Sequence, residues 1–227
     1  MKLNTINPQM LFPKFKLYSS NDQRTGTLAR LMFKIANVPY EDIRISGKEQ
    51  WNDIRNETAL GILPILEIDD VKLSGQTAIC RHLAWRFGLS GQNATCDALL
   101  DMFADLLLEA QVSIFGSAND DNNIYTNIII IDDIKLKGVH NRVASIIEKQ
   151  LTQNNTSYLI GEEITWVDLM TCTFFNSLMN YDKNVNLDRY PLTKYMYERI
   201  SQLTELENYC QQKLDANSNA VQITDCS

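Results

Sequence analysis

The spacing of hydrophobic residues changes several times in the first part of the chain. Phe15 and Leu17 alternate with polar residues as in a strand, and a polar stretch follows them. Apolar residues then recur at helical spacing, giving one apolar face: Leu28, Leu31, Met32 and Ile35. Ile43 and Ile45 return to the spacing of a strand, and residues 49–57 favour a short helix. This part therefore begins strand, helix, strand, helix.

Two short strands and a helix complete the first domain. Residues 63–69 and 71–74 have strand composition and meet at Asp69-Asp70, which predicts a hairpin. The apolar residues within 79–87 are spaced as in a helix that ends near Gly88. The predicted order over residues 14–90 is thus β-α-β-α-β-β-α, which is typical of an α/β domain.

Beyond Asp97 the alternating pattern disappears and helical spacing takes over. Apolar faces indicate two helices: Leu99, Leu100, Phe103, Leu106 and Leu107 for one, and Val139, Val143, Ile146, Ile147 and Leu151 for the other. A third helix begins at Thr165, and shorter patterns cover residues 191–203 and 205–214. The Gly/Ser/Asn-rich stretch 87–97 reads as a linker. We therefore expect an extension (1–13), an α/β domain (14–90), an all-helical domain (91–215) and a poorly ordered tail (216–227).

Composition narrows the choice of partners and compartment. The net charge is −7 with no basic stripe, which disfavours nucleic acid as a partner. The longest apolar run, Ile128 to Ile131, is too short to span a membrane, and the N-terminus lacks the apolar core of a signal peptide. The five cysteines form no Cys-x-x-Cys pair, which favours a reducing, cytoplasmic location. Only two histidines are present, far apart in sequence, so we expect no histidine-based metal site.

Two local motifs have a clear structural interpretation. Thr165 is followed three residues later by Asp168, just before an apolar run, which predicts a capping box at a helix start. Gly161 is expected to permit a tight approach to that helix. Pro64 most simply opens a strand. Alternatively, a cis bond before it would leave the Leu63 backbone to pair with an extended peptide ligand.

Five segments stand in the order of one known family: residues 40–45, Trp51, residues 63–69, residues 78–83 and residues 161–168. Over roughly residues 14–214 the chain resembles a cytosolic glutathione S-transferase, and it looks most like the sigma-type branch. The resemblance implies a thioredoxin-like N-terminal domain, a helical C-terminal domain and a homodimer. It also implies that glutathione binds as co-substrate beside Pro64, with no cofactor.

The resemblance further implies a set of glutathione-binding positions. Main-chain atoms of Leu63 would pair with the cysteinyl unit, and Trp51 and Arg55 would approach the glycine end, where a carboxylate favours a cation. Gly75-Gln76 stand where the family has the Gln-Ser pair that holds the γ-glutamyl end; placing Gln76-Thr77 there would require a one-residue deletion. Glu109 would be the acidic residue lent by the partner subunit.

The expected catalytic tyrosine is missing from its usual place. A gapless comparison puts Ser19 at that position and Thr25 at the position of the usual loop arginine. Ser19 shares a strand face with Phe15 and Leu17, whereas Tyr18 would point to the other face. A hydroxyl that donates to the glutathione sulfur stabilises the nucleophilic thiolate. We therefore rank Ser19 first and Tyr18 second for this role, and assign Ser20 to the loop.

Two functions remain in view. The first is an enzyme that conjugates reduced glutathione to hydrophobic electrophiles, as in detoxification, with the electrophile near Phe103, Leu107 and Ala110. The second is a catalytically degenerate, S-crystallin-like homodimer that binds ligands or serves a structural purpose. The lost tyrosine, loop arginine and Gln-Ser pair favour the second, whereas the retained Trp51, Arg55, Leu63-Pro64 and Glu109 favour the first. We expect the enzyme.

Overall fold

The computed structural model describes residues 13–20, 25–115 and 133–204. Their contacts divide the chain into two compact units, with the boundary between Leu83 and Ala84. The boundary falls inside a helix, a few residues before the predicted domain limit at residue 90.

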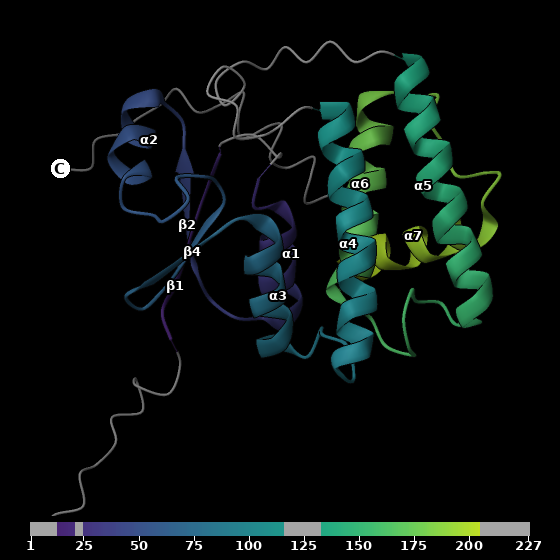
Figure 1. Ribbon diagram of the computed structural model, residues 1–227, viewed down its shortest axis with the longest axis horizontal. Coiled ribbons are helices and arrows are strands. Elements are labelled where there is room, and N and C mark those ends of the chain that lie inside the picture. The colour runs from purple at the N-terminus through teal and green to yellow at the C-terminus, as the bar shows by residue number, and fades with distance from the viewer. Residues whose placement is uncertain (1–12, 21–24, 116–132, 205–227) are drawn as a thin grey trace, which may run out of the picture. The chain divides into compact units, whose positions relative to one another are not determined.

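The N-terminal unit has the predicted order of strands and helices (Figure 1). The elements are β1 (Phe15–Ser20), α1 (Thr27–Ala36), β2 (Glu41–Ile45), α2 (Lys48–Arg55), β3 (Ile65–Ile68), β4 (Val71–Ser74) and α3 (Gln76–Phe87). The sheet order is β2-β1-β3-β4. β1 is parallel to β2 and antiparallel to β3, and β3 and β4 form the predicted hairpin. This mixed sheet confirms the thioredoxin-like α/β class.

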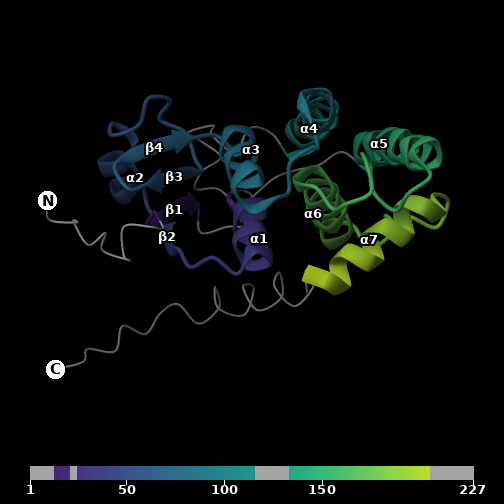
Figure 2. The same ribbon diagram turned by 90° about the horizontal axis from the view of Figure 1, so that it is seen from below.

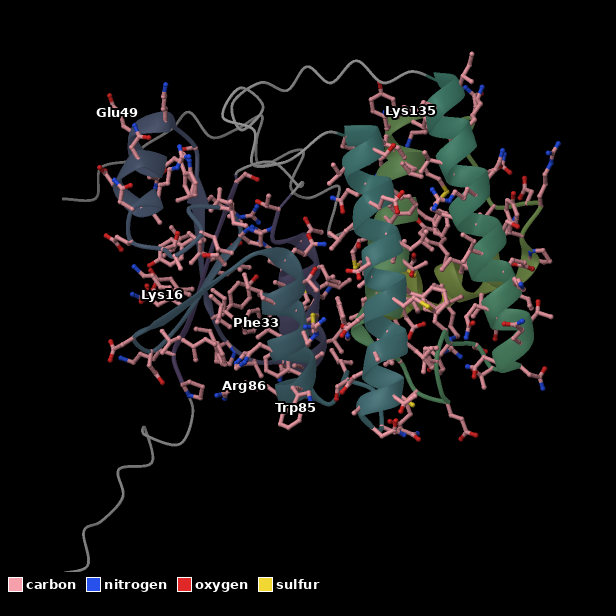
Figure 3. The ribbon with its side chains drawn as sticks, viewed as in Figure 1. Lys16, Phe33, Glu49, Trp85, Arg86 and Lys135 are labelled. Carbon is pink, nitrogen blue, oxygen red and sulfur yellow. The ribbon has the colours of Figure 1, made fainter. Side chains whose placement is uncertain are left out.

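Helices cover both faces of this sheet. α2 lies on one face, and α1 and α3 lie on the other (Figures 1 and 2). On the α2 face, Trp51 is buried with Ile45, Leu63 and Ile65. On the α1 face, Phe33 packs edge-on to Phe15 with ring centroids 5.2 Å apart (Figure 3). Each face therefore excludes water from one set of alternate strand residues.

The turn into β3 contains a cis peptide bond between Leu63 and Pro64. β3 begins at the next residue, Ile65, so Pro64 precedes the strand rather than opening it. The cis bond of the alternative interpretation is therefore present, whereas the pairing of the Leu63 backbone with a peptide ligand stays a prediction.

The helical unit contains α4 (Ala94–Phe115), α5 (Asp133–Asn154), α6 (Trp166–Tyr181) and α7 (Pro191–Thr204). α4 packs against α5 and α6, and α7 packs against the same two helices. The all-helical prediction is confirmed, but the predicted linker is too long, since α4 already begins at Ala94. Asn93 explains this start, because its side chain accepts the Cys96 N–H at 3.0 Å, as an N-cap does. The helical pattern at 205–214 lies outside the described residues.

The predicted capping box is present at the start of α6. The Asp168 carboxylate accepts the backbone N–H and the hydroxyl of Thr165, at 2.8 and 2.7 Å, and the N–H of Leu159 at 2.8 Å. Burial raises the pKa of Asp168 to about 6, although these hydrogen bonds favour its charged form. The expectation for Gly161 was wrong: a Cβ there would meet nothing within 4 Å. Its φ of +72° is the reason for glycine at this position.

Candidate functional site

Ser19 and Tyr18 lie on opposite faces of β1, as the strand pattern predicted. Tyr18 stands beside Ile43 of β2 and Ile65 of β3, on the face that α2 covers. Ser19 follows Leu17 on the face that α1 covers, and both side chains have 0% exposure. The two hydroxyls therefore have different environments, although they are consecutive in sequence.

The Tyr18 hydroxyl is directed at a carboxylate. It donates to Glu67 Oε2 at 2.9 Å, and Glu67 also pairs with Lys16 at 2.9 Å. Burial and this hydrogen bond raise the pKa of Tyr18 to about 12. Burial alone would raise the pKa of Glu67 as well, but the hydrogen bonds from Lys16 and Tyr18 lower it overall. The Tyr18 proton is thus engaged in a polar cluster on the sheet.

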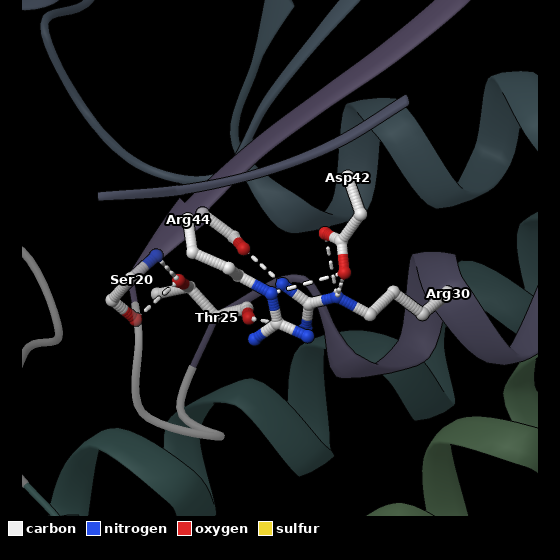
Figure 4. A network of polar contacts seen from close by, with 6 residues as sticks. Ser20, Thr25, Arg30, Asp42 and Arg44 are labelled. Atoms are coloured by element: carbon white, nitrogen blue, oxygen red, sulfur yellow. Dashed lines mark hydrogen bonds and ion pairs between the residues drawn. The ribbon is translucent and has the colours of Figure 1, made fainter. Parts of the chain in front are cut away.

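The Ser19 hydroxyl instead accepts a hydrogen bond from a cation. Arg30 of α1 donates to Ser19 Oγ through Nη2, to the Thr25 carbonyl at 3.3 Å through Nη1, and to Asp42 through Nε (Figure 4). Arg30 is only 1% exposed, and Arg44 donates to the same Asp42 carboxylate at 3.0 Å. A serine that accepts from arginine keeps its own proton for another acceptor. This arrangement is suited to stabilising an anion.

Close packing surrounds Ser19 and the end of β1. Gly26 precedes α1 with a φ of +75°, and a Cβ added there would lie 2.8 Å from the Ser19 Cβ. Ser20 is the last residue of β1, so its assignment to the loop was wrong. Its hydroxyl lies 2.6 Å from that of Thr25. Because Ser19 has no exposed surface in this conformation, a ligand sulfur could reach its hydroxyl only after local movement.

Trp51 is the buried residue of α2 and packs with Leu63, which directly precedes Pro64. Trp51 is 2% exposed, and its indole Nε1 has no hydrogen-bond partner among the described residues. Leu63 belongs to the same buried cluster and precedes the cis bond to Pro64. Arg55 occupies the last turn of α2 and is exposed. A buried donor with no partner is costly to leave unsatisfied.

Gly75 and Gln76 stand at the N-terminus of α3. Gly75 has a φ of +92°, donates its N–H to the Pro64 carbonyl at 3.0 Å, and accepts the Ile79 N–H at 3.1 Å. The start of α3 is therefore tied to the proline turn, and the end of a helix that attracts carboxylates lies beside it. Ser74 adds a buried hydroxyl that is unpartnered among the described residues.

The sequence motifs did not identify two of these groups, Ser74 and Arg30. Ser74 gave no signal beyond its place before Gly75-Gln76. Arg30 gave none either, because it is a charged residue that stands nearly opposite the apolar face formed by Leu28, Leu31, Met32 and Ile35 on the predicted helix. Such a residue must be paired when it is buried.

Glu109 lies on α4 in the helical unit. Its side chain is 69% exposed and its Oε1 is 3.5 Å from Arg142 Nη1 on α5. Phe103, Leu107 and Ala110, expected near the electrophile, are at most 6% exposed and belong to the buried face of α4. They therefore do not form an open surface.

Residues 13–20, 25–115 and 133–204 contain no cluster of three or more potential metal ligands. Nor do they include a helix with the length and apolar character needed to cross a membrane.

Family models match both units of the chain. The model described as the N-terminal domain of glutathione S-transferase matches residues 17–91, and the one for the C-terminal domain matches residues 135–213. The probable glutathione S-transferase gst-36 of Caenorhabditis elegans is 32% identical over 211 residues, covering 88% of this chain and 97% of the relative. This chain belongs to the glutathione S-transferase family, as its motifs predicted.

Solved structures share the fold. A Nu-class glutathione transferase from Haemonchus contortus superposes with a TM-score of 0.73 at 24% identity, covering 89% of this chain and 98% of that one. A transferase described as monomeric, Na-GST-3 from the hookworm Necator americanus, has a TM-score of 0.69 at 22% identity, covering 94% and 100%. These likenesses confirm the thioredoxin-like and helical architecture.

Proposed function

We propose that this protein is a glutathione S-transferase that conjugates reduced glutathione to hydrophobic electrophiles. Family membership and the name of the similar nematode protein support the transferase over a non-catalytic, S-crystallin-like role. In this reaction the glutathione thiol loses its proton to solvent. The thiolate then forms a carbon–sulfur bond with the electrophile, which adds it or expels a leaving group. Glutathione is the co-substrate, and the chemistry requires no cofactor.

The observation that carries the proposal is the buried, unpartnered indole N–H of Trp51 beside Leu63 and Pro64. We assign Trp51 and the exposed Arg55 to the glycine carboxylate of glutathione. The main chain at Leu63 would bind the cysteinyl unit next to Pro64. Gly75 and Gln76, at the start of α3, would receive the γ-glutamyl carboxylate, which the helix N-terminus favours. The tripeptide would thus lie across the N-terminal unit.

Ser19 is our choice for the hydroxyl that stabilises the thiolate. Tyr18 is the weaker candidate, because its proton is donated to Glu67 and its raised pKa makes it a poorer hydrogen-bond donor. Ser19 accepts from Arg30 and retains a proton to donate. The burial of Ser19 means that glutathione binding must open its surroundings, which include Gly26.

Finer assignments rest on the sequence motifs. We propose membership of the sigma-type branch, a cytoplasmic location and a role in detoxification. The domain limits after residues 13, 90 and 215 likewise stay predictions.

A homodimer is also proposed. If Glu109 of one subunit completes the γ-glutamyl site of the other, a single chain holds an incomplete site. Support comes from Leu99, Met102 and Val112, which are 39%, 54% and 52% exposed on α4, as unpaired apolar residues of an interface would be. Sedimentation at micromolar concentration is expected to give twice the single-chain mass. A single-chain mass would refute the dimer and would match the hookworm protein described as monomeric.

The proposed function is tested by titrating glutathione calorimetrically into the wild type and two tryptophan variants. Trp51→Phe removes one hydrogen bond to a carboxylate, so affinity should fall by roughly ten- to a hundredfold. Trp85→Phe is the matched control, because Trp85 is 77% exposed near the end of α3 (Figure 3). Turnover is then measured with chlorodinitrobenzene. Binding without turnover would select the ligand-holding alternative, and absence of binding would refute both.

A further inference from the structure

We propose that Arg30 is a positioning residue for catalysis, which acts by orienting and polarising the Ser19 hydroxyl; this rests on the proposed function. Arg30 is on α1, eleven residues from Ser19, and its guanidinium donates directly to Ser19 Oγ (Figure 4). Arg30 is not one of the expected glutathione-binding positions. Its role would be to prepare the hydroxyl rather than to touch the substrate.

The geometry holds the guanidinium in one orientation. Nε donates to both Asp42 oxygens, at 3.0 and 3.2 Å, while Nη1 donates to the Thr25 carbonyl at 3.3 Å. The remaining Nη2 is thereby aimed at Ser19. Because the guanidinium is planar, the three hydrogen bonds made by Nε and Nη1 also fix the direction of Nη2. The single ammonium of lysine cannot bind all of these partners at once.

This contact has two effects on the serine. It occupies a lone pair of Oγ, so the hydroxyl proton must be donated to some other acceptor. It also places a positive charge beside the oxygen, which strengthens the hydroxyl as a donor to an anion. Both effects favour a thiolate over a thiol. They also compensate for Thr25 at the loop position where the family resemblance implies an arginine: here the cation comes from α1 and binds the Thr25 carbonyl.

A purely structural role is the competing explanation, because a buried arginine paired with Asp42 also stabilises the fold. Arg44 separates the two explanations. It donates to the same Asp42 carboxylate at 3.0 Å and stands beside Ser19 in the strand register, but within the described part of the chain its guanidinium makes no hydrogen bond to Ser19. Arg44→Gln is therefore the matched control for Arg30→Gln: each removes a guanidinium from Asp42, but only one removes the contact with Ser19.

The experiment measures the pKa of the thiol of bound glutathione, from the ultraviolet absorbance of its thiolate as pH is raised. The pH profile of kcat/KM with chlorodinitrobenzene is recorded alongside. Arg30→Gln should raise the thiol pKa and lower kcat/KM at neutral pH by roughly ten- to a hundredfold, with recovery at alkaline pH. Arg30→Lys should recover part of the loss, and Arg44→Gln should shift the thiol pKa much less than Arg30→Gln does, because it leaves the Arg30–Ser19 contact in place.

Two more variants keep the test decisive if Arg30→Gln does not fold. Asp42→Asn retains Arg30 but removes its counter-charge, so the thiol pKa should fall, in the direction opposite to Arg30→Gln. In a Ser19→Ala background, replacing Arg30 with Lys should have no further effect on the thiol pKa, because the contact is already lost.

The inference is overturned if the active wild type and the Arg30 variants share one thiol pKa. It is also overturned if Arg30→Lys shifts that pKa equally with and without Ser19. A wild type that binds no glutathione would instead refute the proposed function, and the role of Arg30 with it. A wild type that binds glutathione without turnover still reports the thiol pKa, so Arg30 is then judged on absorbance alone.

Discussion

Arg30 in the N-terminal unit and Asp168 in the helical unit are both charged and almost completely buried, but their partners differ. Asp168 is bound by Thr165 and Leu159, which belong to the turn and helix start that it closes. Arg30 joins the end of β1, the turn before α1 and strand β2. Removing Asp168 should therefore lower the stability of the fold, whereas removing Arg30 should also lower the rate of the reaction. Burial of a charge does not by itself identify a functional residue.

The largest expected effect is the loss of stability in Asp168→Ala. Three buried donors would lose their acceptor, which should cost about 3–5 kcal/mol in the free energy of unfolding. Thr165→Ala removes fewer bonds and should cost about 0.5–2 kcal/mol. Urea denaturation measures both, with Asp188→Ala as an exposed control. Glutathione affinity of the folded variants should hardly change; a selective loss of affinity at unchanged stability would make Asp168 a site residue.

The next largest expected effect is the contribution of Asp168 to the pH dependence of stability. Its pKa is raised from 3.8 to about 6 on folding, so the native state binds more protons between these values. The contribution of Asp168 to stability should therefore fall by about 3 kcal/mol as pH rises from ~4 to ~6. Asp168→Asn does not titrate, so the difference in unfolding free energy between wild type and variant should shrink across this range. A constant difference would show that burial does not shift the pKa of this carboxyl.

Ser19→Ala should have its main effect on chemistry. It removes one charge-assisted hydrogen bond to the thiolate, worth about 1.5–3 kcal/mol, so turnover at neutral pH should fall by roughly ten- to a hundredfold. The bound glutathione should titrate with a higher thiol pKa. Affinity should change less, because Trp51, Arg55 and the Leu63 backbone hold the tripeptide. An unchanged thiol pKa in an active Ser19→Ala enzyme would remove Ser19 from the mechanism.

Tyr18→Phe should have the smallest effect. It removes a partly exposed hydrogen bond to Glu67, which should cost no more than about 1 kcal/mol of stability. The thiol pKa and turnover should match those of the wild type, since the Tyr18 hydroxyl faces the α2 side of the sheet. A large loss of turnover here, with little effect of Ser19→Ala, would make Tyr18 the catalytic group.

Local patterns predicted most of the fold. The apolar spacing gave the order of elements, Asp69-Asp70 gave the hairpin, and Thr165 with Asp168 gave the start of α6. The prediction from composition placed the start of α4 too late. It treated Gly, Ser and Asn as loop residues and did not consider Asn93 as a helix cap. Arg30 was missed because its partners, Ser19 and Asp42, are eleven and twelve residues away and are brought near by β1 and β2. Contacts between elements of this kind have no periodic signal.

The tight packing between Gly26 and Ser19 limits which side chains position 19 can accept. An aromatic ring at position 19 would need the volume held by the Arg30 guanidinium and the Gly26 backbone, where even an added Cβ would lie 2.8 Å from the serine. Overpacking of this kind is destabilising. Ser19→Tyr alone should therefore destabilise the N-terminal unit. A tyrosine at position 19 would need accompanying changes at Gly26 or Arg30, so these three positions can change only together.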